Sequence, residues 1–312
     1  LSVELVNQEL MDVFNLETKL FPCLVDMRFK GVRVDLEHAA NLKKNLIVRE
    51  NKILSKIKEL TGINVEIHAA RSIAKAFDKL KLPYDRTEKS NEPSFTKNFL
   101  QNHPHELARS IADAREINKA HTTFIDSITK HSAKGRIHAD INQIRSDQGG
   151  TVTGRFSMSN PNLQQIPARH PELGPMIRSI FIPEDKCDWG CFDYSQQEPR
   201  ILVHYAKVEK KDNVDEIIAA YHDEENPADF HQVVADMAGI ERKQAKTINL
   251  GLMYGMGKNK LMAELGLMKE SAEKLIRQYH TKAPFVKQLM DTATQRAEKN
   301  GIIRTIGGRK CH

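Results

Sequence analysis

The stretch RKQAKTINLGLMYG, from Arg242 to Gly255, is the most informative part of this sequence. Four of its residues follow one another at intervals of four positions: Arg242, Lys246, Leu250 and Tyr254. On a helix such residues lie within roughly 120° of the surface. Two cations on one helix face can clamp the phosphates of a ligand. Interior glycines cost about 1 kcal/mol each relative to alanine, so Gly251 and Gly255 suggest close approach by a flat group. The alternative is an ordinary amphipathic helix with a glycine at its end.

The segment DYSQQEPR, from Asp193 to Arg200, supplies the first carboxylates. The stretch Asp188–Tyr194, which runs into the start of this segment, is predicted to be a buried strand. Burying an unpaired carboxylate is costly, so we expect Asp193 at the open end of that strand beside a cation such as a divalent metal. A helix cap or a surface salt bridge is the alternative for Asp193. Pro199 predicts a helix start, where Glu198 either favours the positive helix end or points into the site.

Two weaker signals accompany these segments. His231 follows the Asn226–Pro227 turn and begins a predicted helix with Asp229, and taken alone it reads as a structural histidine. The loop TVTGRFSMSNPNLQQIPAR carries four polar side chains: Arg155, Asn162, Gln164 and Arg169. Amide and guanidinium groups can bind groove edges and phosphates, although most polar loops are simply solvated.

Composition limits the class of protein without fixing it. The chain has 312 residues, 40% of them apolar and 28% charged, as in ordinary globular proteins. A net charge of +6 fits a polyanionic partner. Four cysteines are few for this length and favour a reduced, intracellular setting. The sequence shows no signal peptide and no apolar run of the ~18 residues that a membrane span needs, so we expect a cytoplasmic protein.

Periodicity and punctuation residues predict a mostly helical chain. The expected elements of the first half are a strand at Gly31–Asp35, a helix capped by Asp35 that runs to about Leu60 and ends at a glycine signal in Thr61–Val65, a helix at Ser72–Leu80, a loop at Lys81–Pro93 and helices over Ser94–Ile128. Those of the second half are a strand at Gly135–Ile144, a polar loop at Gly149–Pro167, short strands at Arg178–Pro183 and Asp188–Tyr194, and helices from Arg200 to about Lys299.

Three segments, in this order, resemble the family A DNA polymerases, the family of bacterial DNA polymerase I. TVTGRFSMSNPNLQQIP is similar to the family's T-x-T-G-R-x-S…P-N-L-Q-x-I-P segment. DYSQQEPR resembles its first catalytic motif, DYSQIELR. RKQAKTINLGLMYG resembles its finger-helix motif, R-x-x-x-K-x-x-N-F-G-x-x-Y-G. Nearly the whole chain follows the family's order. Gln197-Glu198-Pro199 departs from the common Ile-Glu-Leu and is more similar to phage members.

The resemblance implies roles around an incoming dNTP. Asp193 matches the metal-binding aspartate, with the Tyr194 carbonyl as a further ligand, and Glu198 matches the steric gate that rejects a ribose 2′-hydroxyl. The residues that match triphosphate contacts are His231, Arg242 and Lys246, and Lys246 is also implied as the donor of a proton to the leaving pyrophosphate. Leu250 stands where the family usually has Phe or Tyr against the sugar, which puts discrimination against chain terminators in doubt.

The resemblance also implies contacts with primer–template DNA. Tyr254 matches the tyrosine beside the templating base, and Arg155 matches a minor-groove contact at the primer end. Gln164 and Arg169 match weaker template or nucleotide contacts. The implied reaction is nucleotidyl transfer with two Mg²⁺ ions, one activating the primer 3′-hydroxyl and the other supporting the leaving pyrophosphate.

The implied fold is an α+β right-hand polymerase fold, mostly helical and truncated. We expect an N-terminal palm segment at 1–40, the thumb at 41–130, palm with the first catalytic motif at 131–200, and fingers at 201–312. The family's second carboxylate motif, His-Asp-Glu, follows the finger helix. His222-Asp223-Glu224 precedes that helix, so we interpret it as an exposed helix end. With Asp193 as the only matched metal carboxylate, the 312 residues alone are expected to be inactive.

Two other functions stay open from the sequence. A single-subunit RNA polymerase shares the hand-like plan, although Glu198 and the tyrosine-first DYSQ context disfavour it. A non-catalytic nucleic-acid-binding module predicts duplex affinity that falls with salt, with no response to the correct incoming dNTP.

Overall fold

The computed structural model describes residues 2–147, 149–168, 170–223 and 229–311. The chain divides into two compact units, one consisting of Phe14–Gly190 and the other combining Leu1–Val13 with Cys191–His312. Helices dominate both units, and the described strands pair in small antiparallel sheets. The predicted α+β, mostly helical class is therefore confirmed. The division into two units does not distinguish palm, thumb and fingers from one another. The assignment of segments to these parts stays a prediction.

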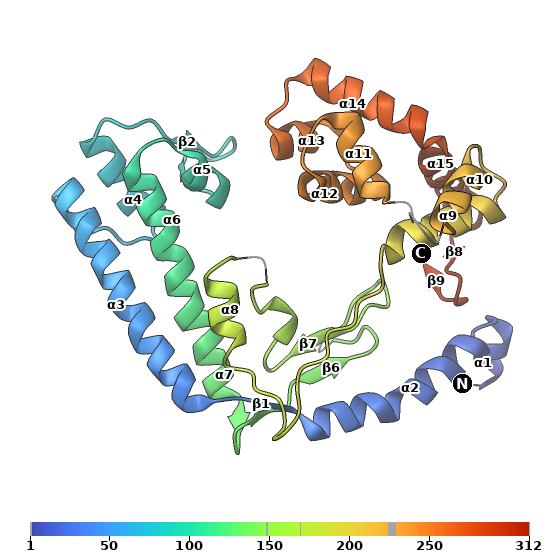
Figure 1. Cartoon of the computed structure of the whole chain (residues 1–312), viewed down its shortest axis with the longest axis horizontal. Helices are drawn as coiled ribbons and strands as arrows, with labels where there is room; N and C mark the ends of the chain where they lie inside the picture. Colours follow the sequence, from blue (N-terminus) through green and yellow to red (C-terminus); the bar gives the residue numbers. More distant parts are fainter. Residues whose placement is uncertain (1, 148, 169, 224–228, 312) are drawn as a thin grey trace. The chain divides into compact units, whose positions relative to one another are not determined.

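In the unit Phe14–Gly190, two long helices lie side by side: α3 (Leu36–Thr61) and α6 (Glu106–Lys119) (Figure 1). The start of α3 is fixed by Asp35, whose side chain accepts a hydrogen bond from the His38 N–H at 2.8 Å. Its end is fixed by Gly62, which has a φ of 67° in the left-handed region that favours glycine. Both boundaries agree with the sequence prediction.

The unit contains further helices, most of which contribute to its two apolar cores. They are α2 (Met11–Lys30, which begins in the other unit), α4 (Ala70–Lys79), α5 (Lys97–Asn102), the π-helix η1 (Ala120–Ile125), α7 (Asp126–Lys130), the 3-10 turn η2 (Leu163–Gln165) and α8 (Leu173–Arg178). One core surrounds Phe77 and the other surrounds Ile137, both of which are almost completely buried.

Short strands complete this unit. They are β1 (Val32–Arg33), β2 (Asp85–Arg86), β3 (Pro93–Ser94), β4 (Ser132–Ala133), β5 (Arg136–Ile137), β6 (Asp140–Asn142) and β7 (Ser157–Ser159). They form a three-stranded sheet in the order β1-β5-β4 and the two hairpin-like pairs β2-β3 and β6-β7. The register pairs Val32 with Ile137, and Ile141 with Met158.

Several strand predictions need correction. The predicted strand at Gly135–Ile144 is two strands, β5 and β6, and the predicted loop at Lys81–Pro93 contains β2. The predicted strand at Arg178–Pro183 is wrong: α8 ends at Arg178, and the one described pairing in the range is an isolated bridge between Val34 and Phe181. The segment has a neighbour, since the Asp35 N–H donates to the Ile180 carbonyl at 2.9 Å and the Ile182 N–H to the Arg33 carbonyl at 3.1 Å, but this pairing is a single bridge and does not extend into a strand.

The unit with Cys191–His312 is helical. Its elements are α1 (Ser2–Asn7), α9 (Gln197–Val208), α10 (Val214–Tyr221), α11 (Phe230–Ala238), α12 (Arg242–Met253), α13 (Lys258–Leu265), α14 (Lys269–Lys282), α15 (Pro284–Asn300), and the paired strands β8 (Ile303–Arg304) and β9 (Lys310–Cys311). Helices α11, α12 and α14 pack around one apolar core that includes Ile248, Tyr279 and Phe285 (Figure 1). None of the described helices combines the length and the apolar character needed to cross a membrane.

Candidate functional site

A pocket of about 330 Å³ lies within the unit that contains Cys191–His312. One face of α12 contributes Arg242, Lys246 and Leu250, which are spaced by four as the helical prediction required. The segment 193–199 and His231 line the rest of the pocket. The pocket therefore joins seven residues that the sequence singled out: Asp193, Tyr194, Glu198, His231, Arg242, Lys246 and Leu250.

We call the pocket surface formed by Arg242, Lys246 and His231 the cationic wall. Asp229 holds its Arg242 side chain in place. Asp229 caps α11 by accepting hydrogen bonds from the backbone N–H groups of His231 (3.0 Å) and Gln232 (3.2 Å). Its other carboxylate oxygen accepts a hydrogen bond from Arg242 Nε. Burial favours the protonated form of Asp229, but the bonds from Arg242 and the two N–H groups outweigh it and lower its pKa. The charged carboxylate thus fixes the Arg242 side chain to the start of α11.

His231 is buried although it lines the pocket, with only 3% of its surface exposed. Its Nδ1 lies 3.0 Å from Asn249 Nδ2, and Asn249 Oδ1 accepts a hydrogen bond from the Tyr279 hydroxyl at 2.8 Å. Burial lowers the pKa of His231; Asp229 opposes this shift, while Lys246 and Arg242 reinforce it. Sequence reasoning missed Asn249 and Tyr279. An amide on the buried side of an amphipathic helix was the available signal for Asn249.

The acidic wall of the pocket, formed by the segment 193–199, differs from the strand predicted to carry Asp193. The segment 188–194 is not a strand in the structure, and its residues are exposed, with Phe192 96% exposed. The expectation of a buried strand that carries Asp193 at its open end is therefore wrong, because no described segment pairs with it. Asp193 still faces the pocket. Within the described residues, neither Asp193 nor Lys246 makes a hydrogen bond or ion pair, so both charges are available to a ligand.

Gln196 connects this acidic segment to the helices. Its Oε1 accepts hydrogen bonds from the Phe230 N–H at 3.2 Å and from the Tyr221 hydroxyl at 3.5 Å. Burial raises the pKa of Tyr221 to about 12, so its hydroxyl stays protonated and can donate. The residues after Asp193 are thereby tied to the first turn of α11, next to His231.

Glu198 lies in the first turn of α9, as Pro199 predicted. Its carboxylate accepts a hydrogen bond from the Tyr254 hydroxyl at 2.8 Å. This bond links Tyr254, at the end of α12, to the pocket-lining Glu198, although Tyr254 itself does not line the pocket.

The two glycines of α12 have a structural explanation. Gly255 follows the helix end with a φ of 78°, a conformation that L side chains rarely adopt. A Cβ at Gly251 would stand 1.9 Å from Met256 Cε, because the Met256 side chain packs over it. The described contacts therefore favour the glycine helix end over close approach by a flat ligand group.

Tyr254, one of the residues predicted to contact DNA, directly follows α12, whereas Arg155, Gln164 and Arg169 fall within the other unit. Arg155 is exposed, and Gln164 lies in the middle of η2, where its side-chain amide donates to the Phe156 carbonyl at 3.1 Å. Asn162 caps the same turn by accepting the Gln164 N–H at 3.1 Å. Arg169 lies outside the described residues.

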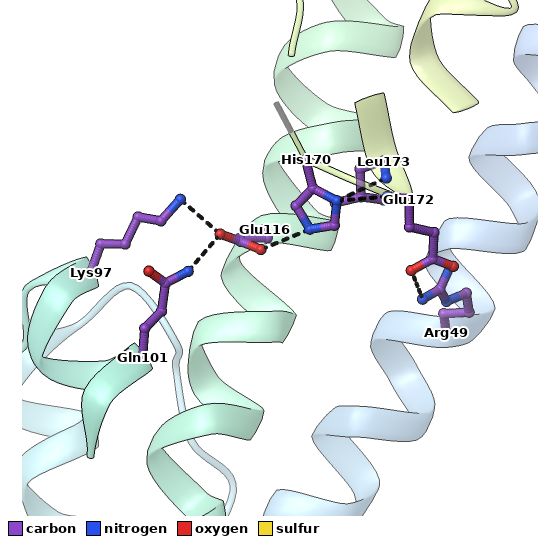
Figure 2. Close-up of polar contacts among 7 residues, drawn as sticks. All are labelled: Arg49, Lys97, Gln101, Glu116, His170, Glu172 and Leu173. Carbon is purple, nitrogen blue, oxygen red and sulfur yellow. Dashed lines mark hydrogen bonds and ion pairs between the residues drawn. The ribbon is translucent and has the colours of Figure 1, made fainter. Parts of the chain in front are cut away.

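Figure 2 shows how the chain just after Arg169 is held. His170 Nδ1 accepts hydrogen bonds from backbone N–H groups at the start of α8, and its Nε2 donates to Glu116 Oε2 at 3.1 Å. Glu116 also pairs with Lys97 at 2.8 Å. Burial opposes ionisation of Glu116, but Lys97 and His170 prevail and lower its pKa. The Arg49–Glu172 pair, at 2.6 Å, fixes the same turn to α3.

The His222-Asp223-Glu224 triplet agrees with its interpretation as a helix end. His222 and Asp223 are exposed and directly follow α10, while Glu224 lies outside the described residues. The triplet is not part of the Asp193 pocket as described.

Comparison with known proteins places the chain in a family. The model of DNA polymerase family A matches residues 36–312. A DNA-directed DNA polymerase of Pseudomonas phage M6 is 34% identical, over 99% of this chain and 54% of its own length. DNA polymerase I of Geobacillus stearothermophilus is 32% identical, over 93% of this chain and 33% of its own length.

A solved structure confirms the fold. The POL domain of Pol1 from M. smegmatis, in complex with DNA primer-template and dNTP, matches 99% of this chain and 55% of its own, with a TM-score of 0.82 and 24% identity. The predicted right-hand polymerase fold is thereby confirmed. The chain spans about half the length of this domain and of the phage relative. Since the family model covers almost all of it, the chain belongs to DNA polymerase family A.

Proposed function

We propose that the pocket binds the triphosphate of an incoming dNTP, and that this chain serves template-directed DNA synthesis onto a primer 3′-hydroxyl. One observation carries the proposal: the α12 cations, the buried His231 and the carboxylates Asp193 and Glu198 line a single pocket. Cations on one helix face suit phosphate oxygens. A carboxylate opposite them suits a metal ion that bridges protein and phosphate.

Each of these pocket residues has a proposed role, and so does Tyr254, which is bonded to one of them. Arg242, Lys246 and His231 hold the phosphates, and Lys246 also protonates the leaving pyrophosphate. Leu250 packs against the sugar. Glu198, held by its bond from Tyr254, excludes a ribose 2′-hydroxyl. Tyr254 stacks beside the templating base.

The donor set fits magnesium. Family A DNA polymerases generally use divalent metal ions, and the Asp193 carboxylate and Tyr194 carbonyl are hard oxygen donors of the kind that Mg²⁺ prefers. Among the described residues no three His, Cys, Asp or Glu side chains converge, which suits an ion that takes its remaining ligands from water and phosphate oxygens. We propose two Mg²⁺ ions, which supply charge neutralisation and an activated 3′-hydroxyl when bound.

Primer–template DNA is the proposed second ligand. Arg155, Gln164 and Arg169 are the proposed contacts to it, and the setting is the cytoplasm of a bacterial or phage-infected cell. With Asp193 as the only carboxylate matched to the family's metal motifs, we expect the 312 residues by themselves to bind dNTP without robust synthesis. Strong Mg²⁺-dependent primer extension by this polypeptide alone is the contrary result.

The test of the proposal is equilibrium binding of dATP and Mg²⁺ to the chain. Lys246→Ala should weaken binding about tenfold, because a hydrogen bond to a charged group contributes about 1.5–3 kcal/mol. Lys243→Ala is the matched control, since Lys243 is exposed on the same helix and does not line the pocket. Equal affinity of both variants would overturn the proposal and favour a non-catalytic nucleic-acid-binding module.

Glu198 distinguishes DNA synthesis from RNA synthesis. The wild-type pocket should bind dATP more tightly than ATP, and Glu198→Ala should reduce that preference. A wild-type preference for ATP would favour the single-subunit RNA polymerase instead.

A further inference from the structure

Behind the pocket, three buried polar side chains from three helices form a continuous hydrogen-bonded row. They are His231 of α11, Asn249 of α12 and Tyr279 of α14, with exposed fractions of 3%, 0% and 1%. Buried polar groups cost free energy unless they are paired. Three buried polar side chains that pair with one another are therefore a specific arrangement. Apolar side chains would fill the same core without needing hydrogen-bond partners.

The geometry orients each member of this row. The Tyr279 hydroxyl donates to Asn249 Oδ1 at 2.8 Å, which turns the Asn249 amide nitrogen toward His231 Nδ1 at 3.0 Å. Burial raises the pKa of Tyr279, so its hydroxyl keeps the proton that it donates. An amide NH₂ is only a donor, so Nδ1 must accept. In a neutral imidazole the single proton then sits on Nε2.

We propose that Asn249 and Tyr279 are positioning residues that keep the His231 proton on Nε2, where the ring donates a hydrogen bond to a phosphate of the bound nucleotide. The inference rests on the proposed dNTP function, because it assigns the ligand of the same pocket. Neither residue touches the ligand. They act through His231, which lines the pocket.

The charges around His231 make the position of this proton matter. The ring faces Asp229 on its own helix, Arg242 and Lys246 on α12, and the Tyr279 hydroxyl of α14 through Asn249. Burial lowers the pKa of His231; Asp229 opposes this, and the two cations add to it. The neutral ring is thus favoured around pH 7. With its proton on Nδ1, that ring would present a lone pair to phosphate oxygens and repel them.

The position of Tyr279 ties α14 to this role. Its ring packs edge-on against Phe230 at 6.4 Å between centroids, next to His231 in the chain. Removing only the hydroxyl, as in Tyr279→Phe, keeps this packing and frees the Asn249 amide to turn. A purely structural role for the hydroxyl would change stability but leave the proton on the same ring nitrogen.

The test reads the tautomer directly in the chain labelled with ¹⁵N-histidine, by nitrogen–proton correlation NMR. His231→Gln identifies the signal. We expect the Nε2–H tautomer in the wild type and a growing Nδ1–H fraction in Tyr279→Phe and Asn249→Leu. The affinity for dATP and Mg²⁺ should fall about tenfold in Asn249→Leu, the size of one lost charge-assisted bond, and less in Tyr279→Phe. Tyr205→Phe, in α9, is the control and should change neither quantity.

Each outcome decides a claim. A wild-type Nδ1–H tautomer, or an unchanged tautomer in Tyr279→Phe, overturns the inference. If Asn249→Leu does not fold, Tyr279→Phe decides alone. If Lys246→Ala weakens dATP binding while the tautomer ignores Asn249 and Tyr279, the inference fails and the proposed function stands. If Lys246→Ala leaves dATP affinity unchanged, the proposed function fails, whatever the tautomer.

Discussion

The cationic and acidic walls of the pocket belong to one unit but are built differently. Arg242 and His231 each bond to a second side chain, Asp229 and Asn249, and the helices that carry them share a buried core. Asp193 stands in an exposed segment without regular secondary structure. Under the proposed function, the contrast predicts that the helices preorganise phosphate recognition, whereas metal binding at Asp193 would depend on oxygens that the ligand supplies.

The largest expected effect is on the core behind the cationic wall. Phe285 is completely buried and packs 6.2 Å from the Phe230 ring, between centroids. Phe285→Ala should lower the unfolding free energy of this unit by about 3–5 kcal/mol, since it removes apolar contacts and leaves a cavity. Urea denaturation followed by circular dichroism measures the loss. A cost near zero would mean that α11 is not held by this core.

The next effect concerns the cationic wall itself. Removing both cations, in the double variant Arg242→Ala with Lys246→Ala, should weaken dATP binding roughly a hundredfold, because two charge-assisted bonds are lost. Isothermal titration calorimetry measures the affinity. The charge-matched control is Lys243→Ala with Lys260→Ala, two exposed positions that do not line the pocket. Similar affinities in the two double variants would show that Arg242 and Lys246 contribute no more to dATP binding than exposed lysines outside the pocket.

A smaller, conditional effect is expected at the acidic wall. Asp193→Asn should weaken dATP binding about tenfold in Mg²⁺, by the loss of one metal-bridged contact, and leave it unchanged in EDTA. Lys246→Ala, in contrast, should weaken binding in both conditions. Asp188→Asn, in the same exposed segment, serves as control. If Asp193→Asn acts equally with and without Mg²⁺, the carboxylate does not work through a metal.

The smallest effect should come from the aromatic side chain next to Asp193. Phe192 is 96% exposed, so Phe192→Ser should change the unfolding free energy by less than about 0.5 kcal/mol. Thermal unfolding monitored by circular dichroism is sufficient. A loss above about 1 kcal/mol would show that this segment packs against the unit in solution.

Local signals in the sequence predicted the parts that are locally determined. Asp35 and the glycine after Thr61 marked the ends of α3, and the spacing of Arg242, Lys246 and Leu250 predicted the face of α12 that lines the pocket. Caps and helix faces involve residues within a few positions of one another.

The misses involve partners that are distant in the chain. The letters WGCF at 189–192 resemble a strand, but a strand forms only beside another one, and nothing in the segment specifies which. The Tyr279–Asn249 bond joins residues 30 positions apart, and it exists because α11 packs against both α12 and α14. Periodicity could place Asn249 on the buried side of its helix, but it could not name its partners.

The central claim is that Asp193 and the cationic face of α12 meet at one metal–triphosphate ligand. The most direct measurement replaces Mg²⁺ with paramagnetic Mn²⁺ and follows backbone amide signals of the chain during titration with Mn²⁺ and dATP. Signals of residues 193–195 and 246–250 should broaden together, and Asp193→Asn should abolish both effects at low Mn²⁺. Broadening confined to residues 193–195, with α12 unaffected, would contradict the account.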